Sequence, residues 1–233
     1  MTGAMNRRDL LLGGLAAGAT LGLSARAAAQ SLSEDFDKAF AARPVAPVAE
    51  PAPAIVMPPV RDPVYERKVL EIAARESSRV GNVLWRRDLV GVADFARPSS
   101  LPRLHFANLE NGTVRSFFVA HGRGSDPEHD GWLKNFSNIP GSEATSRGAY
   151  LTCEWYNGKY GTSIRLQGLD GDNSHALDRA IVMHPAWYAA SDMLAKYGKL
   201  GRSEGCFAMA PDDFNEALWR LSGGRLLFAD RIA

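Results

Sequence analysis

The sequence predicts a mainly β domain with a few peripheral helices, preceded by an N-terminal helix. From about residue 90 onward, short apolar runs alternate with Asn-Gly and other glycine-containing turns, a texture typical of paired strands. Between residues 63 and 79, apolar side chains instead recur at helical spacing. Hydrophobic residues make up 45% of the 233 and charged residues 23%. This composition is that of a folded globular protein, and it excludes a wholly disordered chain and a polytopic membrane protein.

The first 29 residues are expected to be an export signal. Arg7-Arg8 precede an apolar run from Leu10 to Leu23, whose 14 residues are too few to cross a hydrocarbon core roughly 30 Å thick. Ala27-Ala28-Ala29 then fits a small-residue cleavage site. The paired arginines and the glycine-rich core favour a twin-arginine signal over an ordinary secretory one. We therefore expect a protein of the periplasm or cell envelope without stable membrane insertion, unless the signal stays uncleaved as an anchor.

Residues 30–62 are expected to be a proline-rich linker, because seven of the chain's 13 prolines fall between positions 44 and 63. Proline fixes φ and removes a backbone donor, so such a segment is extended and builds no core. Removal of residues 1–29 leaves 24 basic and 25 acidic side chains, a net charge of −1. This balance provides no global field for nucleic acid, and no nucleic-acid partner is expected.

A helix is predicted over residues 63–79. Asp62 suits the N-cap, Pro63 suits the first helical position, and Gly81 is expected to end the helix. Residues 63–89 would then form a helical segment packed against a domain of residues 90–233.

Within that domain, the turn Glu110-Asn111-Gly112 predicts a first hairpin, with its return strand at 114–119. Asn157-Gly158 predicts a second hairpin that pairs residues 150–156 with 160–166. The remaining predictions are a strand at 180–183, a helix at 187–197, a helix beginning at Pro211 and a terminal strand at 226–232.

Cys206 is the first candidate for chemistry. The preceding Gly205 allows a sharp turn and leaves backbone N–H groups that can face a developing oxyanion. A cysteine attacks as a thiolate and needs a base, and His184, which follows the apolar residues 181–183, is the candidate. Spacing alone does not separate this pairing from the commoner buried, inert cysteine.

Residues 90–230 resemble the catalytic domain of the L,D-transpeptidases, the YkuD-type peptidoglycan enzymes, and in particular the branch called murein L,D-transpeptidase catalytic domain proteins. The resemblance depends on several short segments that occur in order over about 140 residues: His121-Gly122-Arg123-Gly124-Ser125, Phe136-Ser137-Asn138, Gly141-Ser142, Thr145-Ser146-Arg147-Gly148, Ala180-Ile181-Val182-Met183-His184 and Gly201-Arg202-Ser203-Glu204-Gly205-Cys206.

The resemblance implies a β-sandwich-like fold with the cysteine at the mouth of a cleft. It implies that Cys206 attacks the stem-peptide amide before the terminal D-alanine and passes the acyl group to an amine of a neighbouring stem, giving a 3→3 crosslink. His184 would be the base, its other ring nitrogen bound to the carbonyl of Pro185. The backbone of Gly205 and Cys206 would form the oxyanion hole, and no metal or other cofactor is implied.

Further residues are expected on the substrate side: Ser203, Arg202, Pro185, His121 and Asn138. Ser203 and Arg202 would shape the cleft, and Arg202 could pair with a substrate carboxylate. A solvated surface charge is the alternative interpretation of Arg202. The chain departs from the broader family pattern, because Glu204 and Ala208 stand where a histidine and an arginine are usual and Pro185 replaces a glycine. These departures leave open which acceptor is recognised and whether the acyl group is transferred to an amine or hydrolysed by water.

Three alternatives are a carboxypeptidase or endopeptidase that hydrolyses the same thioester, a non-catalytic peptidoglycan-binding module, and a metal-dependent peptidase using His121, His129 and His184. A polar loop over the cleft is a better interpretation of His121, His129 and the nearby acidic residues than a metal site. Cys153 is expected to be a small core residue, with a regulatory disulfide to Cys206 as the less favoured interpretation.

Overall fold

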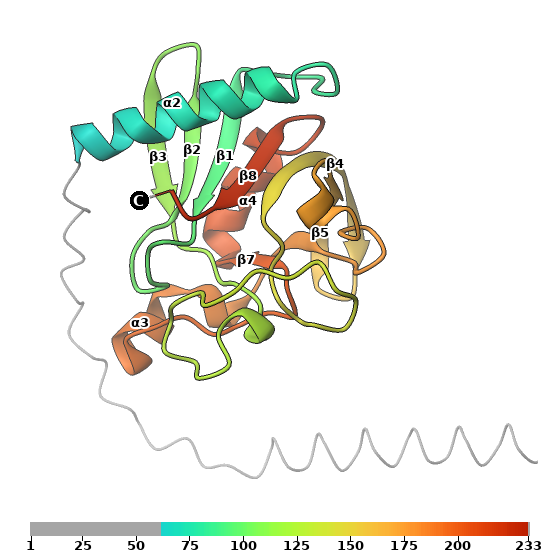
Figure 1. The fold of residues 1–233 in the computed structure, drawn as a ribbon. Helices are drawn as coiled ribbons and strands as arrows, with labels where there is room; N and C mark the ends of the chain where they lie inside the picture. Colours follow the sequence, from blue (N-terminus) through green and yellow to red (C-terminus); the bar gives the residue numbers. More distant parts are fainter. Residues whose placement is uncertain (1–61, 233) are drawn as a thin grey trace, which may run out of the picture. The chain divides into compact units, whose positions relative to one another are not determined.

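Eight strands form one sheet in the order β3-β2-β1-β8-β4-β5-β6-β7, which confirms the mainly β prediction (Figure 1). The computed structural model describes residues 62–232. The expected export signal and nearly all of the proline-rich linker lie outside the described residues. None of the described helices is long and apolar enough to cross a membrane.

The strands are β1 (Leu89–Asp94), β2 (Leu104–Asn108), β3 (Thr113–Phe117), β4 (Gly148–Gly158), β5 (Gly161–Gly168), β6 (Val182–Pro185), β7 (Phe207–Met209) and β8 (Leu226–Asp230). The α-helices of the described residues are α2 (Pro63–Arg79), α3 (Ser191–Tyr197) and α4 (Pro211–Arg220). Most strand pairs are antiparallel, whereas β1 runs parallel to β8 and β6 runs parallel to β7.

Helix α2 occupies the predicted range and packs across β1, β2 and β3 (Figure 1). The Asp62 side chain caps it by accepting hydrogen bonds from the Val64 and Tyr65 amides at 3.0 and 3.1 Å. Gly81 does not act as a left-handed cap, because the helix closes one residue earlier through Val80, whose amide donates to the Glu76 carbonyl. The helix is therefore fixed at its start by a side chain and at its end by backbone.

A buried polar contact fixes α2 on the sheet. The Tyr65 hydroxyl donates to Asp94 Oδ2 at 2.6 Å and lies 2.9 Å from His105 Nε2. At the other end of the helix, Arg79 makes two hydrogen bonds to the carboxylate of Asp170. These contacts explain why α2 packs on the strand domain, as the sequence predicts.

The turn of the first hairpin is confirmed, although its return strand β3 ends at Phe117 rather than at residue 119. The second hairpin prediction is wrong in detail. Gly112, with φ 66°, turns the chain between β2 and β3 as predicted. In the second hairpin Gly158 pairs with Gly161, so the turn lies at Lys159-Tyr160 rather than at Asn157-Gly158. A register shift between Thr152 and Trp155 accompanies this displacement. Such bulges insert residues that strand alternation does not reveal.

Three further predictions need correction. The predicted helix at 187–197 divides into a short 3₁₀ turn (Trp187–Ala189) and α3, because Ala190 is extended with ψ 159°. The strand predicted at 180–183 lies instead at Val182–Pro185, since Ala180 adopts a positive φ of 52°. The terminal strand ends at Asp230, two residues earlier than predicted.

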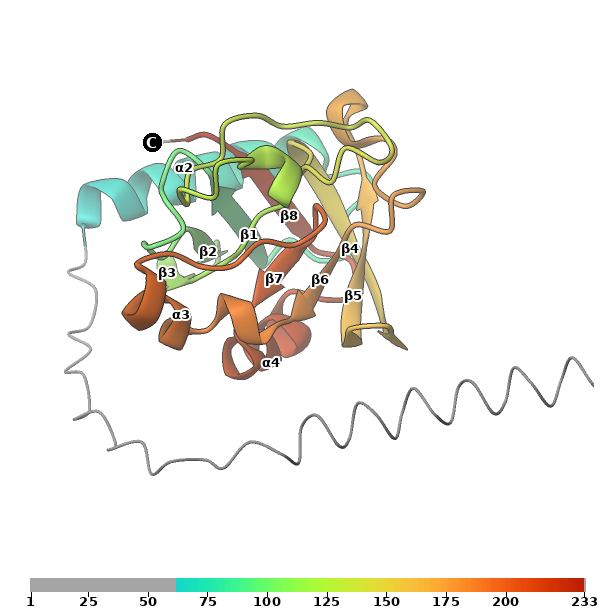
Figure 2. The same cartoon turned by 90° about the horizontal axis from the view of Figure 1, so that it is seen from below.

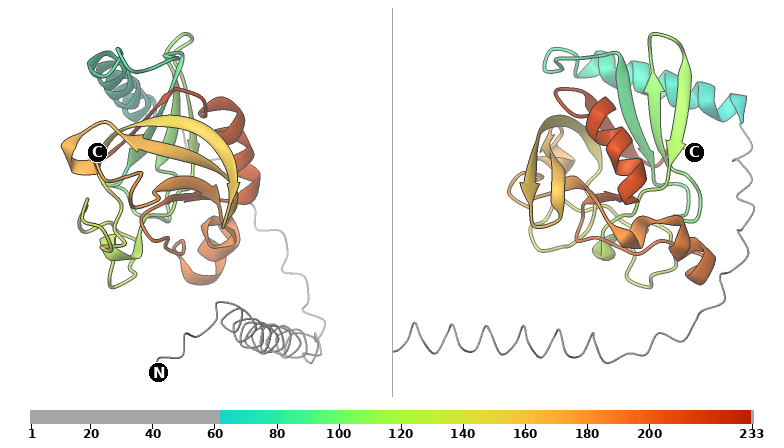
Figure 3. Two further views of the ribbon diagram at one scale, coloured as in Figure 1. Left: turned by 90° about the vertical axis from the view of Figure 1, so that its right-hand side faces the viewer. Right: turned by 180° about the vertical axis from the view of Figure 1, so that it is seen from behind.

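The sheet is strongly curved, and its concave side encloses the main core. Phe95, just after β1, has its ring centroid 6.1 Å from that of Phe207 in the edge strand β7. Since five steps separate β1 and β7 in the sheet order, this contact requires the sheet to fold over itself. Phe214 of α4 joins the same core, and α4 lies between the β1–β3 strands and the β4–β5 hairpin (Figure 3, right).

Candidate active site

The parallel pair β6–β7 brings the two candidate catalytic residues to one region of the sheet. Met183 pairs with Phe207 and His184 with Ala208, and β6 and β7 lie side by side next to β5 (Figure 2). The Met183 and Phe207 side chains enter the main core. Because side chains alternate along a strand, His184 and Ala208 face the opposite side, and Cys206, two residues before Ala208, is expected there too. His184 lies inside β6 rather than at its end.

The His184 ring is held in one tautomer. Its Nδ1 lies 3.0 Å from the Pro185 carbonyl oxygen, which can only accept a hydrogen bond, so Nδ1 carries the proton and Nε2 has the free lone pair. Tyr160 stacks on the ring at 4.4 Å between centroids, with the planes 21° apart. Burial lowers the pKa of His184, so its imidazole is a neutral base.

Cys206 is almost completely buried, with 5% of the residue exposed to solvent. It donates a long hydrogen bond to the Ala180 carbonyl, with Sγ and oxygen 3.6 Å apart. Burial and the nearby Glu204 carboxylate raise the pKa of Cys206, whereas the Val182 backbone and Arg179 oppose that shift. The expectation of a cysteine open at a cleft mouth is therefore not met in this structure.

Gly205 occupies a conformation that only glycine adopts readily. Its φ is 113°, and a Cβ placed on it would lie 2.8 Å from the Ala144 carbonyl oxygen. Its N–H is not free for an oxyanion, because it donates to Ser203 Oγ at 3.2 Å. Ser203 in turn donates to the Cys206 carbonyl at 2.7 Å. Ser203 thus holds the Gly205-Cys206 turn directly. For the Gly205 N–H to serve an oxyanion as expected, its long bond to Ser203 would have to be exchanged for one to the oxyanion.

Arg179 is a site residue that the sequence analysis missed. Its guanidinium donates to four oxygen atoms of the 137–146 loop, whose segments contribute to the family resemblance. It also lies beside the Gly205-Cys206 turn, because its Nη2 is 3.3 Å from the position that a Gly205 Cβ would take. No motif or spacing marks this arginine, since it becomes part of the site only through the turn that precedes β6.

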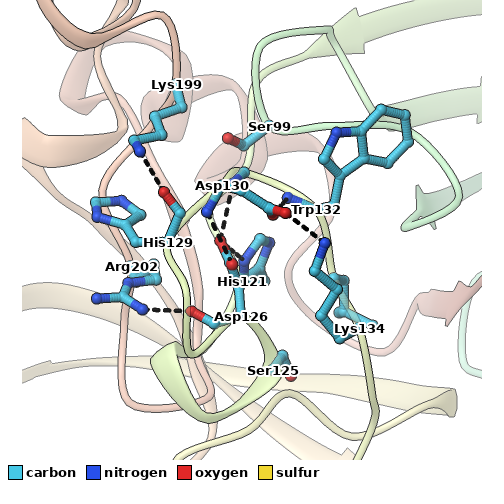
Figure 4. A network of polar contacts seen from close by, with 12 residues as sticks. Ser99, His121, Ser125, Asp126, His129, Asp130, Trp132, Lys134, Lys199 and Arg202 are labelled. Atoms are coloured by element: carbon cyan, nitrogen blue, oxygen red, sulfur yellow. Dashed lines mark hydrogen bonds and ion pairs between the residues drawn. The ribbon is translucent and has the colours of Figure 1, made fainter.

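The cluster of histidines and acidic residues joins the 121–134 loop to the segment before Cys206 (Figure 4). Arg202 Nη1 donates to the backbone oxygens of Asp126 and Pro127, so this guanidinium is engaged by the protein itself. His129 Nε2 lies 3.0 Å from the Leu200 carbonyl, and Lys199 donates to the His129 carbonyl. Among residues 62–232, no three His, Cys, Asp or Glu side chains are grouped as a metal site would require.

His121 lies in the interior and not on a substrate-facing surface, since it is 1% exposed. The buried Arg103 donates through Nη2 to His121 Nδ1 at 2.6 Å, and His121 Nε2 faces Asp126 Oδ2 at 3.3 Å. Burial and the charge of Arg103 lower the pKa of His121, so the imidazole is neutral and donates to Asp126. His121 therefore supports the loop, and the expected substrate contact is not available to its side chain.

The remaining candidates have defined positions. The Asn138 side-chain amide donates to the Gly171 carbonyl at 2.9 Å and its oxygen accepts from the His175 amide, so it joins two loops. Cys153 is a half-buried free thiol on β4, and burial raises its pKa. Cys206 is likewise a free thiol, so the structure contains no disulfide between them.

Two surface hollows lie away from these residues. One, of about 680 Å³, is lined by Arg86, Arg87, Asp88, Leu109, Glu110 and Arg225. The other, of about 450 Å³, lies where α2 meets the loop before β4, and Arg79 and Asp170 form an ion pair across it. Neither of these two hollows is lined by Cys206 or His184.

A family model described as the L,D-transpeptidase catalytic domain, YkuD_2, matches residues 62–229. Solved structures with similar folds include an L,D-transpeptidase from Mycobacterium smegmatis, at 15% identity and a TM-score of 0.37, covering 61% of this chain and 58% of that one. They also include the helical cell shape determining protein Pgp2 from Campylobacter jejuni, at 14% identity and a TM-score of 0.42, covering 74% of this chain and 58% of that one.

A third is an L,D-transpeptidase from Xylanimonas cellulosilytica, at 14% identity and a TM-score of 0.37, covering 61% of this chain and 60% of that one. This chain therefore spans less than two thirds of the length of these structures. No curated protein matches the sequence. The family model alone covers well over half of the chain, from the cap of α2 to the last strand, and the chain belongs to the L,D-transpeptidase catalytic domain family.

Proposed function

We propose that this protein is a cysteine-dependent peptidoglycan L,D-transpeptidase. In the first half-reaction the Cys206 sulfur attacks the carbonyl carbon before the terminal D-alanine of a tetrapeptide stem, and its proton passes to His184 Nε2. The amide C–N bond breaks, D-alanine leaves with that proton, and a thioester remains. An amine of a neighbouring stem then attacks the thioester and gives its proton to His184. The new amide is a 3→3 crosslink, and the thiol regains its proton.

The observation that carries this proposal is the β6–β7 register together with the His184–Pro185 hydrogen bond. The register puts a tautomerically fixed, neutral imidazole on the sheet face toward which the Cys206 side chain is expected to point. A neutral imidazole with a free Nε2 is the species that can take a thiol proton. Tyr160 restrains the ring plane by stacking on it, so the base keeps its direction through both half-reactions.

The backbone of the nucleophile turn would stabilise the tetrahedral intermediate. The Gly205 N–H is engaged by a hydroxyl rather than by another carbonyl, and this 3.2 Å bond is long enough to be exchanged for an oxyanion. Because Ser203 Oγ also donates to the Cys206 carbonyl, the turn stays restrained while the exchange takes place. Arg202 would act by fixing the 126–127 loop beside the turn.

We also infer that the protein acts in the periplasm or cell envelope. The inference depends on Arg7-Arg8, the short apolar run after them and Ala27-Ala28-Ala29. Arg7→Lys/Arg8→Lys should prevent export by the twin-arginine route, and cell fractionation measures where the protein accumulates. Unchanged export of the double variant would favour the ordinary secretory route.

The decisive experiment is mass spectrometry of products from disaccharide-tetrapeptide mixed with the protein. A crosslinked dimer that lacks one D-alanine and requires Cys206 would establish transpeptidation. A tripeptide without a dimer would mean that water resolves the thioester and that the protein is a carboxypeptidase. Cys206→Ala should remove all turnover, and Cys153→Ala, which changes the other free thiol, is the matched control and should retain it.

Two further outcomes bear on the nucleophile. His184→Ala should lose most turnover, because the thiol then lacks its base. A carbapenem, a β-lactam that the family resemblance implies as an acylating agent, should add its mass to Cys206 and not to Cys153. Turnover by Cys206→Ala at the normal rate would contradict the proposal. The absence of product from folded wild-type protein would contradict it as well.

A further inference from the structure

Arg179 is clamped by one loop. Its Nη1 donates to the Ser137 carbonyl and to Ser146 Oγ, both at 2.6 Å. Its Nη2 donates to the Ala144 carbonyl at 2.5 Å and to Ser142 Oγ at 3.2 Å. All four acceptors are uncharged oxygens, so they fix the position of the guanidinium without neutralising its charge.

None of the described carboxylates forms an ion pair with this guanidinium either. Within residues 62–232, Arg179 makes no ion pair, whereas Arg79, Arg147 and Arg165 each pair with an aspartate or glutamate. Arg179 is also partly buried, and burial lowers its pKa. A half-buried cation without an anion costs free energy unless a negative charge forms nearby.

The place where such a charge forms is the neighbouring thiol. Arg179 Nη2 lies 3.3 Å from the position of a Gly205 Cβ, directly before Cys206. The next residue, Ala180, accepts the thiol hydrogen bond through its carbonyl and has an unfavourable φ of 52°. The backbone is therefore strained at Ala180, the residue that follows Arg179 and whose carbonyl accepts the thiol hydrogen bond.

We propose that Arg179 is a positioning residue whose fixed positive charge stabilises the Cys206 thiolate, and that it does so while clamping the 137–146 loop beside the nucleophile turn. The inference rests on the proposed function, since it takes Cys206 as the nucleophile. As the thiol gives its proton to His184 Nε2, the sulfur becomes an anion, and the guanidinium beside Gly205 can stabilise it while keeping its own contacts to the loop.

Other groups facing the thiol do not replace Arg179. Glu204 lies in the same turn and opposes ionisation of the thiol, as burial does. Tyr150 on β4 and Tyr188 beside β6 are neutral phenols, because burial raises the pKa of each. His184 is neutral until it receives the proton. Among the charged groups described around Cys206, Arg179 therefore supplies the positive charge before proton transfer.

The test is the ionisation of Cys206, followed by its ultraviolet thiolate absorbance against pH, with the Cys206→Ser protein subtracted. Arg179→Gln should lower the thiolate-to-thiol ratio roughly tenfold at the wild-type midpoint, as expected for loss of an opposite charge at short range. Arg179→Lys keeps the charge and should lower the ratio less than about threefold. Arg147→Gln removes a neighbouring arginine that pairs with Asp230, and it should titrate like wild type.

Equal titration of Cys206 in Arg179→Gln and in wild type would overturn the inference. Equal titration in Arg179→Lys and Arg179→Gln would overturn it as well, because the role of Arg179 would then be to clamp the loop only. If Arg179→Gln fails to fold, wild-type protein supplies the second measurement. Relative to iodoacetamide, the anionic iodoacetate should alkylate Cys206 several-fold more favourably in folded protein than in the urea-unfolded chain. An unchanged preference would overturn the inference. None of these outcomes alters the product assay, so the proposed function is tested separately.

Discussion

Substitution of Gly205 by alanine should damage both stability and turnover, and its cost can be worked out from the structure. At φ 113° a residue with a side chain is strained by about 1–3 kcal/mol. The new Cβ would also lie 2.8 Å from the Ala144 carbonyl oxygen, which cannot yield easily because Arg179 donates to it. Such overpacking costs about 1–3 kcal/mol. We expect a total loss near 3 kcal/mol.

Thermal unfolding is the assay for this loss. At about 2–4 °C for each kcal/mol in a domain of this size, the Tm of Gly205→Ala should fall by roughly 10 °C. Turnover should fall about a hundredfold or more, because the Cys206 sulfur must shift with its turn. The matched control is Gly112→Ala, whose glycine also has a positive φ, 66°, but has no atom near its Cβ position. That variant should lose about 1 kcal/mol and no turnover. If Gly205→Ala loses no more stability than Gly112→Ala, the reasoning from the Ala144 contact is refuted.

Three further predictions concern the cap, a buried histidine and the base. Asp62→Ala should cost about 1 kcal/mol in urea unfolding by uncapping α2, whereas Asp62→Asn should cost little; equal losses would contradict the cap. Burial lowers the pKa of His105 to about 4, so stability should decline as the pH falls from 6.5 toward 4, by up to about 3 kcal/mol. His105→Gln should flatten the decline in the free energy of unfolding as the pH falls. An unchanged slope would contradict the assignment of that decline to His105. Because burial lowers the pKa of His184, the acid limb of the turnover profile should lie below the ordinary histidine range, and a limb at or above that range would contradict a neutral buried base.

Local signals in the sequence predict much of the fold. The Asp62-Pro63 pair marks the start of α2, and Gly112 marks the first hairpin, because each depends only on neighbouring residues. The second turn lies at Lys159-Tyr160 rather than at Asn157-Gly158, because its position is set by the register between β4 and β5, which is a property of two strands together. Strand β7 was not predicted, since three residues gain their strand geometry only from pairing with β6.

The candidate site likewise has features that the sequence predicts and features that it does not. Ser203, Gly205 and Cys206 lie within four consecutive positions, so their proximity can be predicted from the sequence. The hydrogen bond between His184 and the Pro185 carbonyl, which the family resemblance implies, is present. The place of Arg179 could not be predicted, since its acceptors lie 33 to 42 positions away and only the folded loop brings them to its guanidinium. His121 was misplaced because the sequence gives no sign of its partner Arg103, which is fully buried.

Burial shifts the pKa values of the two catalytic candidates in opposite directions, and both shifts favour the neutral form. It raises the pKa of the Cys206 thiol and lowers the pKa of the His184 imidazole, so both groups favour their neutral forms at rest. A permanent thiolate–imidazolium pair would have to bury two charges before any substrate arrives, at a desolvation cost that their attraction only partly offsets. Proton transfer during attack avoids that cost. In such a site the clamped, unpaired charge of Arg179 lowers the free energy needed to form the thiolate, although burial still keeps the resting thiol neutral.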